Sequence, residues 1–123
     1  MILLGRADEG ELLNLAGDKK GSIVSYFGYV RRENNGKMVK RMVCEERDSS
    51  HEIMEKIEKE IKERFDVKNV ILYHTVGNVP VGGLLAAVIV STVHRDSGFN
   101  ACRYGIDRIK ELEPVYREEI LEG

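Results

Sequence analysis

The sequence predicts an α+β fold, in which a mostly antiparallel sheet carries helices packed on one face. Three runs of strand length, 21–30, 67–75 and 84–93, are rich in β-branched or aromatic residues, and a fourth, 37–45, contains the apolar residues Met38, Val39, Met42 and Val43. The segment 49–65 instead repeats isoleucine every four positions, which is the spacing of one helical face. The expected order, β-α-β-β-α-β-β-α, lacks the regular strand–helix alternation of a parallel sheet.

The length of 123 residues fits a single domain covering residues 1–123. Hydrophobic residues make up 42% of the chain and charged residues 33%, which is typical of a globular protein with a charged surface. The formal net charge of −2 provides no global basic field for nucleic acid. Any cationic cluster is therefore local and suited to a small anionic ligand.

No segment predicts a membrane span or a cleaved leader. The apolar run 84–93 is about half the length of a membrane-spanning helix, and the first residues lack a basic region and a cleavage pattern. Cys44 and Cys102 show no CxxC spacing, so we expect two free thiols in a reducing compartment and a cytoplasmic location.

The chain begins with a short expected strand, Met1–Leu4. Asp8 is a suitable N-cap for a helix at Glu9–Ala16, and Gly17 is a suitable end for it. The strand Gly21–Val30 follows, with β-branched and aromatic residues along most of its length.

Gly28 within that strand indicates a bulge or a close backbone approach. The polar segment Arg31–Gly36 ends in an Asn-Gly turn signal, and a second strand is expected at Lys37–Glu45. The two strands would form a hairpin around this loop.

The helix Ser49–Phe65 has the strongest signal in the chain. Ser49 and Glu52 match a capping box. Its apolar face contains Ile53, Met54, Ile57, Ile61 and Phe65. A strand at Val67–Thr75 and a turn at Gly77–Gly83 follow.

The uncharged run Leu84–Val93 predicts a buried central strand. Ser97 is a suitable N-cap for a second long helix at Gly98–Leu112, and Pro114 stops that helix. The expected core stripe of this helix is Phe99, Cys102, Ile106 and Ile109.

Two basic groups are candidates for chemistry around this strand and helix. His94 and Arg95 stand where the central strand ends, so they are either an anion-binding pair or an exposed strand end. Arg103 and Lys110 are seven residues apart on one edge of the helix. Lys110 is either a proton-transfer residue or a side chain whose ammonium group reaches bulk water.

Two other sets of polar residues were weighed. Arg31 and Arg32 open the polar loop and would either close over a ligand or remain solvated. His51 and His74 have no carboxylate or cysteine at metal-ligand spacing, so no metal site is expected.

The chain resembles the family of the large, catalytic subunit of molybdopterin synthase, the MoaE family. The most specific match is SxxHRxxxFxACRxxxDxxKxxxPxYRxE over 91–119. SYFGYVR at 25–31 is similar to the family's F-x-G-x-V-R, and 70–77 is similar to V-x-x-x-H-R-x-G, with Thr75 where a basic residue is common. The segment 45–51 and the helix after it also match.

The resemblance implies a sulfurtransferase of molybdenum cofactor biosynthesis with an α/β-hammerhead-like fold. Two large subunits form a homodimer, and a small ubiquitin-like subunit binds each of them to give a heterotetramer. The Gly-Gly tail of the small subunit carries a thiocarboxylate. Its sulfur is transferred to cyclic pyranopterin monophosphate to make the dithiolene of molybdopterin. No cofactor, nucleic acid or membrane is implied.

The resemblance also implies site residues. The catalytic residues would be Lys110 and Arg117. The substrate-binding residues would be Tyr29, Val30, Arg31, His94, Arg95, Arg103, Lys110, Arg117, Glu118 and Glu119. The family usually has Trp at the position of Tyr116 and Lys at that of Arg117; arginine keeps the charge but cannot act as a base. Family members often continue beyond residue 123, and that tail can contribute to the partner's site.

Two other functions remain open from the sequence. The first is a non-catalytic scaffold that binds a ubiquitin-like sulfur carrier. The second is a phosphoryl-transfer or hydrolytic enzyme on a similar sheet, although such an enzyme needs a carboxylate–metal cluster that the sequence does not display.

Overall fold

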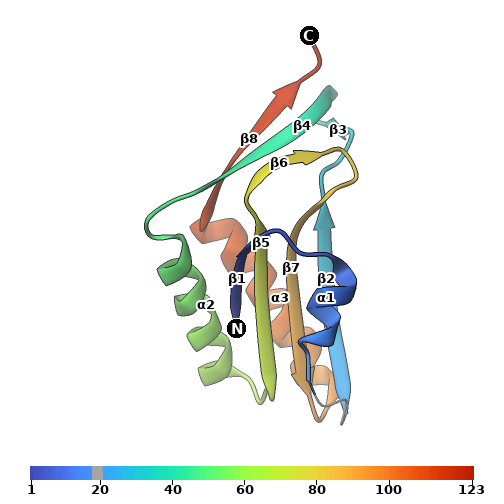
Figure 1. Cartoon of the computed structure of the whole chain (residues 1–123). Helices are drawn as coiled ribbons and strands as arrows, with labels where there is room; N and C mark the ends of the chain where they lie inside the picture. Colours follow the sequence, from blue (N-terminus) through green and yellow to red (C-terminus); the bar gives the residue numbers. More distant parts are fainter. Residues whose placement is uncertain (18–20) are drawn as a thin grey trace.

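A computed structural model of the chain describes residues 1–17 and 21–123, and it confirms the α+β prediction (Figure 1). The elements are β1 (Ile2–Gly5), α1 (Glu9–Asn14), β2 (Ser22–Tyr29), β3 (Glu33–Asn34), β4 (Lys37–Glu46), α2 (Ser50–Arg64), β5 (Asn69–Thr75), β6 (Gly77–Pro80), β7 (Leu84–Thr92), α3 (Arg95–Leu112) and β8 (Val115–Leu121). No helix within these described residues is long and apolar enough to cross a membrane.

The main sheet has the strand order β1-β5-β7-β2. Only β1 and β5 are parallel, and both pairs that involve β7 are antiparallel. β7 lies at the centre and is buried along nearly its whole length, as its uncharged sequence predicts.

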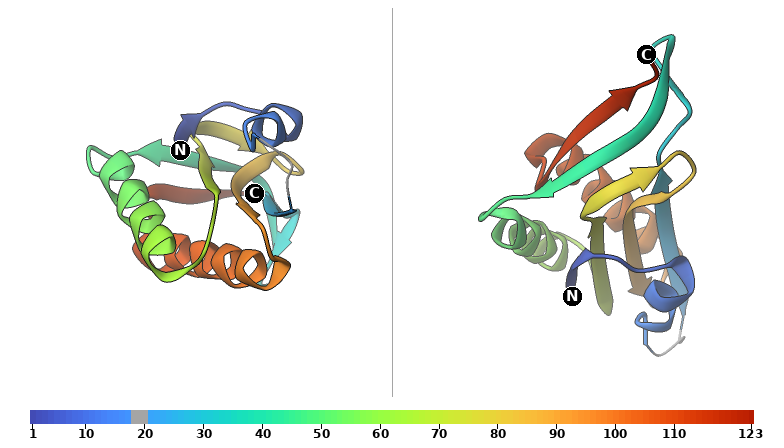
Figure 2. Two further views of the ribbon diagram at one scale, coloured as in Figure 1. Left: turned by 90° about the horizontal axis from the view of Figure 1, so that it is seen from below. Right: turned by 45° about the horizontal axis from the view of Figure 1, so that its top comes forward.

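The strands β3, β4 and β6 form a second sheet, in which β8 pairs with β4. The expected hairpin between the strands at 21–30 and 37–45 is therefore wrong, because β2 pairs with β7 and β4 pairs with β6 and β8. The Asn-Gly turn is present, with φ of 52° at Asn35 and 79° at Gly36, but it joins β4 to the short β3. β4 and β8 extend together away from the main sheet (Figures 1 and 2).

The two long helices, α2 and α3, pack on one face of the main sheet, whereas α1 lies on the other face (Figure 2, left). Met54, Ile57 and Ile61 of α2 meet the sheet and α3 in the larger core. Leu12 and Ala16 cover the opposite side of β5 and β7. The prediction that the helices pack on one face of the sheet is therefore correct for α2 and α3 and wrong for α1.

The helix α3 begins at Arg95 with His94 as its N-cap residue, rather than at Gly98 after Ser97. Its buried residues are Gly98, Ala101, Cys102, Gly105 and Ile109. Phe99 is 56% exposed, so its expected core position is wrong. The glycines allow a close approach to the sheet, since a Cβ on Gly98 would lie 2.9 Å from a methyl carbon of Val24.

The start of α2 is held by Ser50 instead of the expected capping box. The Ser49 side chain makes no cap hydrogen bond. The buried Ser50 hydroxyl accepts from the backbone N–H of Arg47 at 2.7 Å and donates to the carbonyl of Pro114. This bond ties the start of α2 to the turn between α3 and β8, which fixes where β8 begins.

Candidate active site

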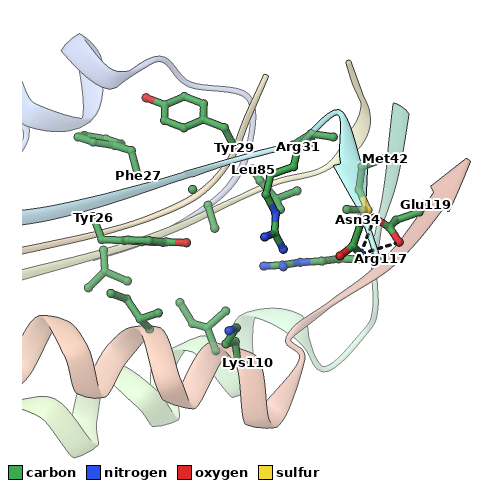
Figure 3. Close-up of a pocket in the computed structure, with 16 residues that line it drawn as sticks. Tyr26, Phe27, Tyr29, Arg31, Asn34, Met42, Leu85, Lys110, Arg117 and Glu119 are labelled. Atoms are coloured by element: carbon green, nitrogen blue, oxygen red, sulfur yellow. Dashed lines mark hydrogen bonds between the residues drawn. The ribbon is translucent and has the colours of Figure 1, made fainter. Parts of the chain in front are cut away.

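A pocket of about 760 Å³ lies between β2, the last turns of α3 and the strand β8 (Figure 3). β2 contributes alternate residues on one of its faces, Tyr26 and Gly28, as expected for side chains of period two. α3 contributes Ile109 and Lys110 near its C-terminus. Other lining residues are Phe27, Tyr29, Val30, Arg31, Asn34, Met42, Leu85, Ala86, Val88, Ile106, Arg117 and Glu119.

Three basic side chains reach into this pocket from three different segments. The guanidinium groups of Arg31 and Arg117 extend into the same space, and the ammonium group of Lys110 points up from α3 (Figure 3). Among the described residues, none of these three forms a salt bridge with a carboxylate. Their charges are therefore available to an anionic ligand.

The one acidic lining residue, Glu119, is occupied by a neighbour. Asn34 donates from Nδ2 to both carboxylate oxygens of Glu119, at 3.1 and 3.0 Å (Figure 3). Among the described residues, this carboxylate forms no salt bridge with Arg31 or Arg117.

The side chain of Arg117 is anchored by His74. The Nε–H of Arg117 donates to Nε2 of His74 at 3.0 Å, and His74 is fully buried at the end of β5. Burial, with a smaller contribution from the Arg117 charge, lowers the pKa of His74 to about 4 despite the opposing effect of the hydrogen bond to Thr75. Desolvation also lowers the pKa of Arg117, although its side chain keeps contact with solvent.

The structure brings six of the predicted site residues together in the pocket: Tyr29, Val30, Arg31, Lys110, Arg117 and Glu119. Arg103 and Glu118 do not line it. Arg103 lies about 10 Å along α3 from Lys110, because seven residues of helix separate them. Glu118 lies between Arg117 and Glu119 on β8, so its side chain points to the opposite face of the strand from theirs.

His94 and Arg95 do not meet Lys110 within one chain. They stand at the N-terminal end of α3, where they line a shallow depression with Ser22, Val93 and Asp96. Lys110 is in the last turn of the same helix, about 22 Å away along its axis. Within one chain, His94 and Arg95 are therefore not part of the pocket that Lys110 lines.

Several site residues were missed from the sequence. Tyr26 shares its strand face with Gly28 and lies over it, since a Cβ on Gly28 would lie 2.6 Å from the Tyr26 hydroxyl oxygen. Strand alternation could have identified Tyr26. His74 was considered only as a metal ligand, and no sequence pattern links it to Arg117, 43 positions later.

No group of three or more His, Cys, Asp or Glu side chains is arranged to hold a metal ion in residues 1–17 and 21–123. The donors in the pocket are instead guanidinium and ammonium groups. Such donors bind phosphate and carboxylate oxygens, so the site is suited to an organic anion.

Comparisons with known proteins identify the family of this chain. The sequence profile of the family described as "MoaE protein" matches residues 6–112. The chain is 35% identical over 101 residues to the molybdopterin synthase catalytic subunit of Pyrococcus abyssi, an alignment that covers 81% of this chain and 68% of that protein. The chain thus spans about two thirds of that relative.

Two solved structures share the fold. The molybdopterin synthase of Staphylococcus aureus superposes with a TM-score of 0.87 at 24% identity, covering 98% of this chain and 90% of that one. A complex of subunits 1 and 2 of the molybdopterin-converting factor from Helicobacter pylori superposes with a TM-score of 0.78 at 19% identity, covering 98% and 84%. The profile match across most of the chain and the identity to the Pyrococcus protein show that this chain belongs to the MoaE family.

Proposed function

We propose that this chain is the catalytic subunit of a molybdopterin synthase. It transfers sulfur from the thiocarboxylated C-terminus of a small ubiquitin-like subunit to cyclic pyranopterin monophosphate. The observation that carries the proposal is the group of Arg31, Lys110 and Arg117 in one pocket of a protein with net charge −2; within residues 1–17 and 21–123, none of the three forms a salt bridge with a carboxylate. Both reactants are anions, and this pocket offers them a local positive field.

The three basic groups have different roles in the proposed reaction. Arg31 and Arg117 carry permanent charge and suit the phosphate and the thiocarboxylate. When the thiocarboxylate sulfur attacks the pterin side chain, a C–S bond forms, a C–O bond of the cyclic phosphate breaks, and the departing oxygen needs a proton; water then cleaves the resulting thioester, which leaves the sulfur on the pterin and the tail as a carboxylate. Lys110 is the lining residue that is suited to supply this proton, because guanidinium groups stay protonated.

A second hollow of about 460 Å³ lies beside the first and shares Ile109, Lys110 and Arg117 with it. Two reactants can therefore reach the same pair of basic groups from different sides. We assign the larger pocket to the pterin and the smaller hollow to the Gly-Gly tail. The similar Helicobacter protein was solved with its second subunit, which supports a small-subunit partner for this chain.

We further propose that a second copy of the chain supplies His94 and Arg95. Within one chain they are too far from Lys110 to share its ligand. Val93 and Phe99 lie beside them, and these two apolar side chains are 48% and 56% exposed, as expected for a surface that a second copy covers. The resulting homodimer with one small subunit on each copy is a heterotetramer. We place it in the cytoplasm, where the buried thiols of Cys44 and Cys102 stay reduced.

Single-turnover formation of molybdopterin, from purified substrate and thiocarboxylated partner, tests the activity. Lys110→Ala should nearly abolish conversion and leave binding of the small subunit intact. Lys110→Arg should keep binding but recover little turnover, because the charge survives and proton exchange does not. Near wild-type turnover in Lys110→Arg would reduce Lys110 to an electrostatic anchor, and no turnover in the wild type would favour a non-catalytic scaffold.

Mixed dimers test the shared site. Arg95→Ala alone should weaken substrate binding by roughly 10- to 150-fold, the effect of one charge-assisted hydrogen bond. After exchange of subunits between Arg95→Ala and Lys110→Ala dimers, half of the dimers are mixed, and each mixed dimer contains one intact site. Activity should therefore recover to about a quarter of the wild-type value. No recovery, with subunit exchange verified by mass spectrometry, would overturn the shared site, because each residue would then act only within its own chain.

A further inference from the structure

His74 is the buried titratable side chain beside the pocket that the proposed chemistry does not use. It lies in the buried run of β5, one residue before the end of the strand, and its neighbours in the sheet are Leu4 of β1 and Ala86 of β7. Its ring is fully buried, and both ring nitrogens form hydrogen bonds within the protein. A fully paired imidazole that touches a site residue is a candidate for positioning that residue.

We propose that His74 is a positioning residue, which holds Arg117 so that both terminal nitrogens of its guanidinium group face the pocket as a clamp for the anionic group of the substrate. This inference rests on the proposed function for the identity of the substrate. The contact between His74 and Arg117 is a property of the chain alone and does not depend on the proposed function.

The hydrogen bonds determine which nitrogen of His74 carries the proton. Nδ1 lies 2.8 Å from the carbonyl oxygen of Thr75, which can only accept, so the proton resides on Nδ1. Nε2 of the neutral ring then has a free lone pair. The Nε–H of Arg117 donates to it at 3.0 Å. The two contacts are consistent with one tautomer and with the lowered pKa of the ring.

This contact occupies one N–H of Arg117 and leaves the four N–H bonds of the two terminal nitrogens available to a ligand. A guanidinium group has five N–H bonds, and the Nε–H lies on a different edge from the pair of terminal nitrogens. With Nε held by His74, the terminal nitrogens extend across the pocket toward Arg31 (Figure 3). A lysine at this position has a single nitrogen, which would have to serve both His74 and the ligand.

Preorganisation is the expected benefit. A free arginine side chain loses rotamer freedom when it binds an anion, and that loss reduces affinity. The burial of His74 fixes one end of the contact before the ligand arrives. The hydrogen bond therefore selects the bound orientation of Arg117 in the empty protein.

Two substitutions separate positioning from simple core packing. In His74→Asn, the amide nitrogen can still donate to Thr75, but no acceptor remains at the Nε2 position. In His74→Gln, the amide oxygen lies near that position and can still accept from Arg117. We expect His74→Asn to raise KM for the pterin about tenfold with little change in kcat, and His74→Gln to stay within about threefold of the wild type. Equal losses in both variants, or a fall in kcat alone, would overturn the proposal.

Binding of inorganic phosphate to the full chain provides a readout that does not depend on activity. His74→Asn should weaken phosphate binding about tenfold in the wild-type background and should have no further effect in Arg117→Ala. The NMR signal of the Arg117 Nε–H, assigned by its loss in Arg117→Lys, should be protected from solvent exchange in the wild type and exposed in His74→Asn. A fast-exchanging wild-type signal would overturn the inference, as would an effect of His74→Asn that persists in Arg117→Ala. If these tests succeed but the wild type transfers no sulfur, the proposed function fails and the positioning of Arg117 stands.

Discussion

The buried His74 makes the stability of the fold depend on pH in a defined window. The ordinary pKa of the side chain is 6.5, and burial lowers it to about 4 in the folded protein. As the pH falls below 6.5, the unfolded chain gains a proton on this ring while the folded chain does not, so acid favours unfolding. Above 6.5 both states are neutral, and this source of stability is fully present.

The magnitude follows from the gap between the two pKa values. Each unit corresponds to about 1.4 kcal/mol, so the full loss is roughly 3 kcal/mol, most of it reached by about pH 4.5. The Arg117 charge that faces the ring acts in the same direction, because it disfavours the imidazolium form. A loss of this size is a large part of the stability of a small domain.

Urea denaturation of the wild type and His74→Gln at pH 7.5 and 4.5 measures the effect. Glutamine does not titrate, so the wild type should lose roughly 2–3 kcal/mol more between the two pH values than the variant. The variant serves as the control for every other titrating group, including Glu60, whose pKa is lowered by its hydrogen bond with Arg108. Equal losses in the two proteins would show that the ring is not buried in its neutral form.

Two further predictions concern the packing that positions the site. Gly98→Ala should lower the free energy of unfolding by about 1–3 kcal/mol, because its Cβ would lie 2.9 Å from Val24 and 3.1 Å from the Thr92 hydroxyl oxygen. Gly105→Ala is the matched control: its contacts begin at 3.1 Å and end on side-chain methyl groups, and the gain in helix propensity offsets part of the strain. Ser50→Ala should cost about 1–3 kcal/mol, since it leaves the Pro114 carbonyl unpaired. Thermal unfolding measures the stability of all three variants. The packing described would be contradicted if Gly105→Ala lowered the free energy of unfolding as much as Gly98→Ala does. It would also be contradicted if Ser50→Ala left the free energy of unfolding unchanged.

The parts of the fold that were predicted correctly are those in which local pattern and burial agree. β7 is uncharged because both of its faces are covered, and the isoleucine spacing of α2 matches its buried side. β8 was missed because its sequence, VYREEIL, has three consecutive charged residues at its centre and is mostly exposed. That strand forms by pairing with β4, and no property of residues 115–121 alone reveals the pairing.

The candidate site was predicted in part for a similar reason. Arg31, Lys110 and Arg117 were identified by motif, and the fold brings all three to one pocket. His94 and Arg95 were assigned to the same site by resemblance to the family, but the rise of α3 places Lys110 at the opposite end of that helix, so a single chain does not bring them together. Sequence proximity indicates which residues share a helix, whereas the length of the helix determines which of them share a site.

The pocket combines one fixed and one adaptable cation, and the structure gives a physical reason for each. Arg117 is held by its place opposite Cys44 in the β4–β8 pair, by the hydrogen bond to His74, and by the Ser50–Pro114 contact that fixes the start of its strand. Lys110 stands exposed in the last turn of α3, where its charge is favourable beside the helix C-terminus. A fixed guanidinium group suits the recognition of an anion, which needs a constant orientation. A lysine on a flexible stem suits proton transfer, because its nitrogen must follow the reacting oxygen as bonds change.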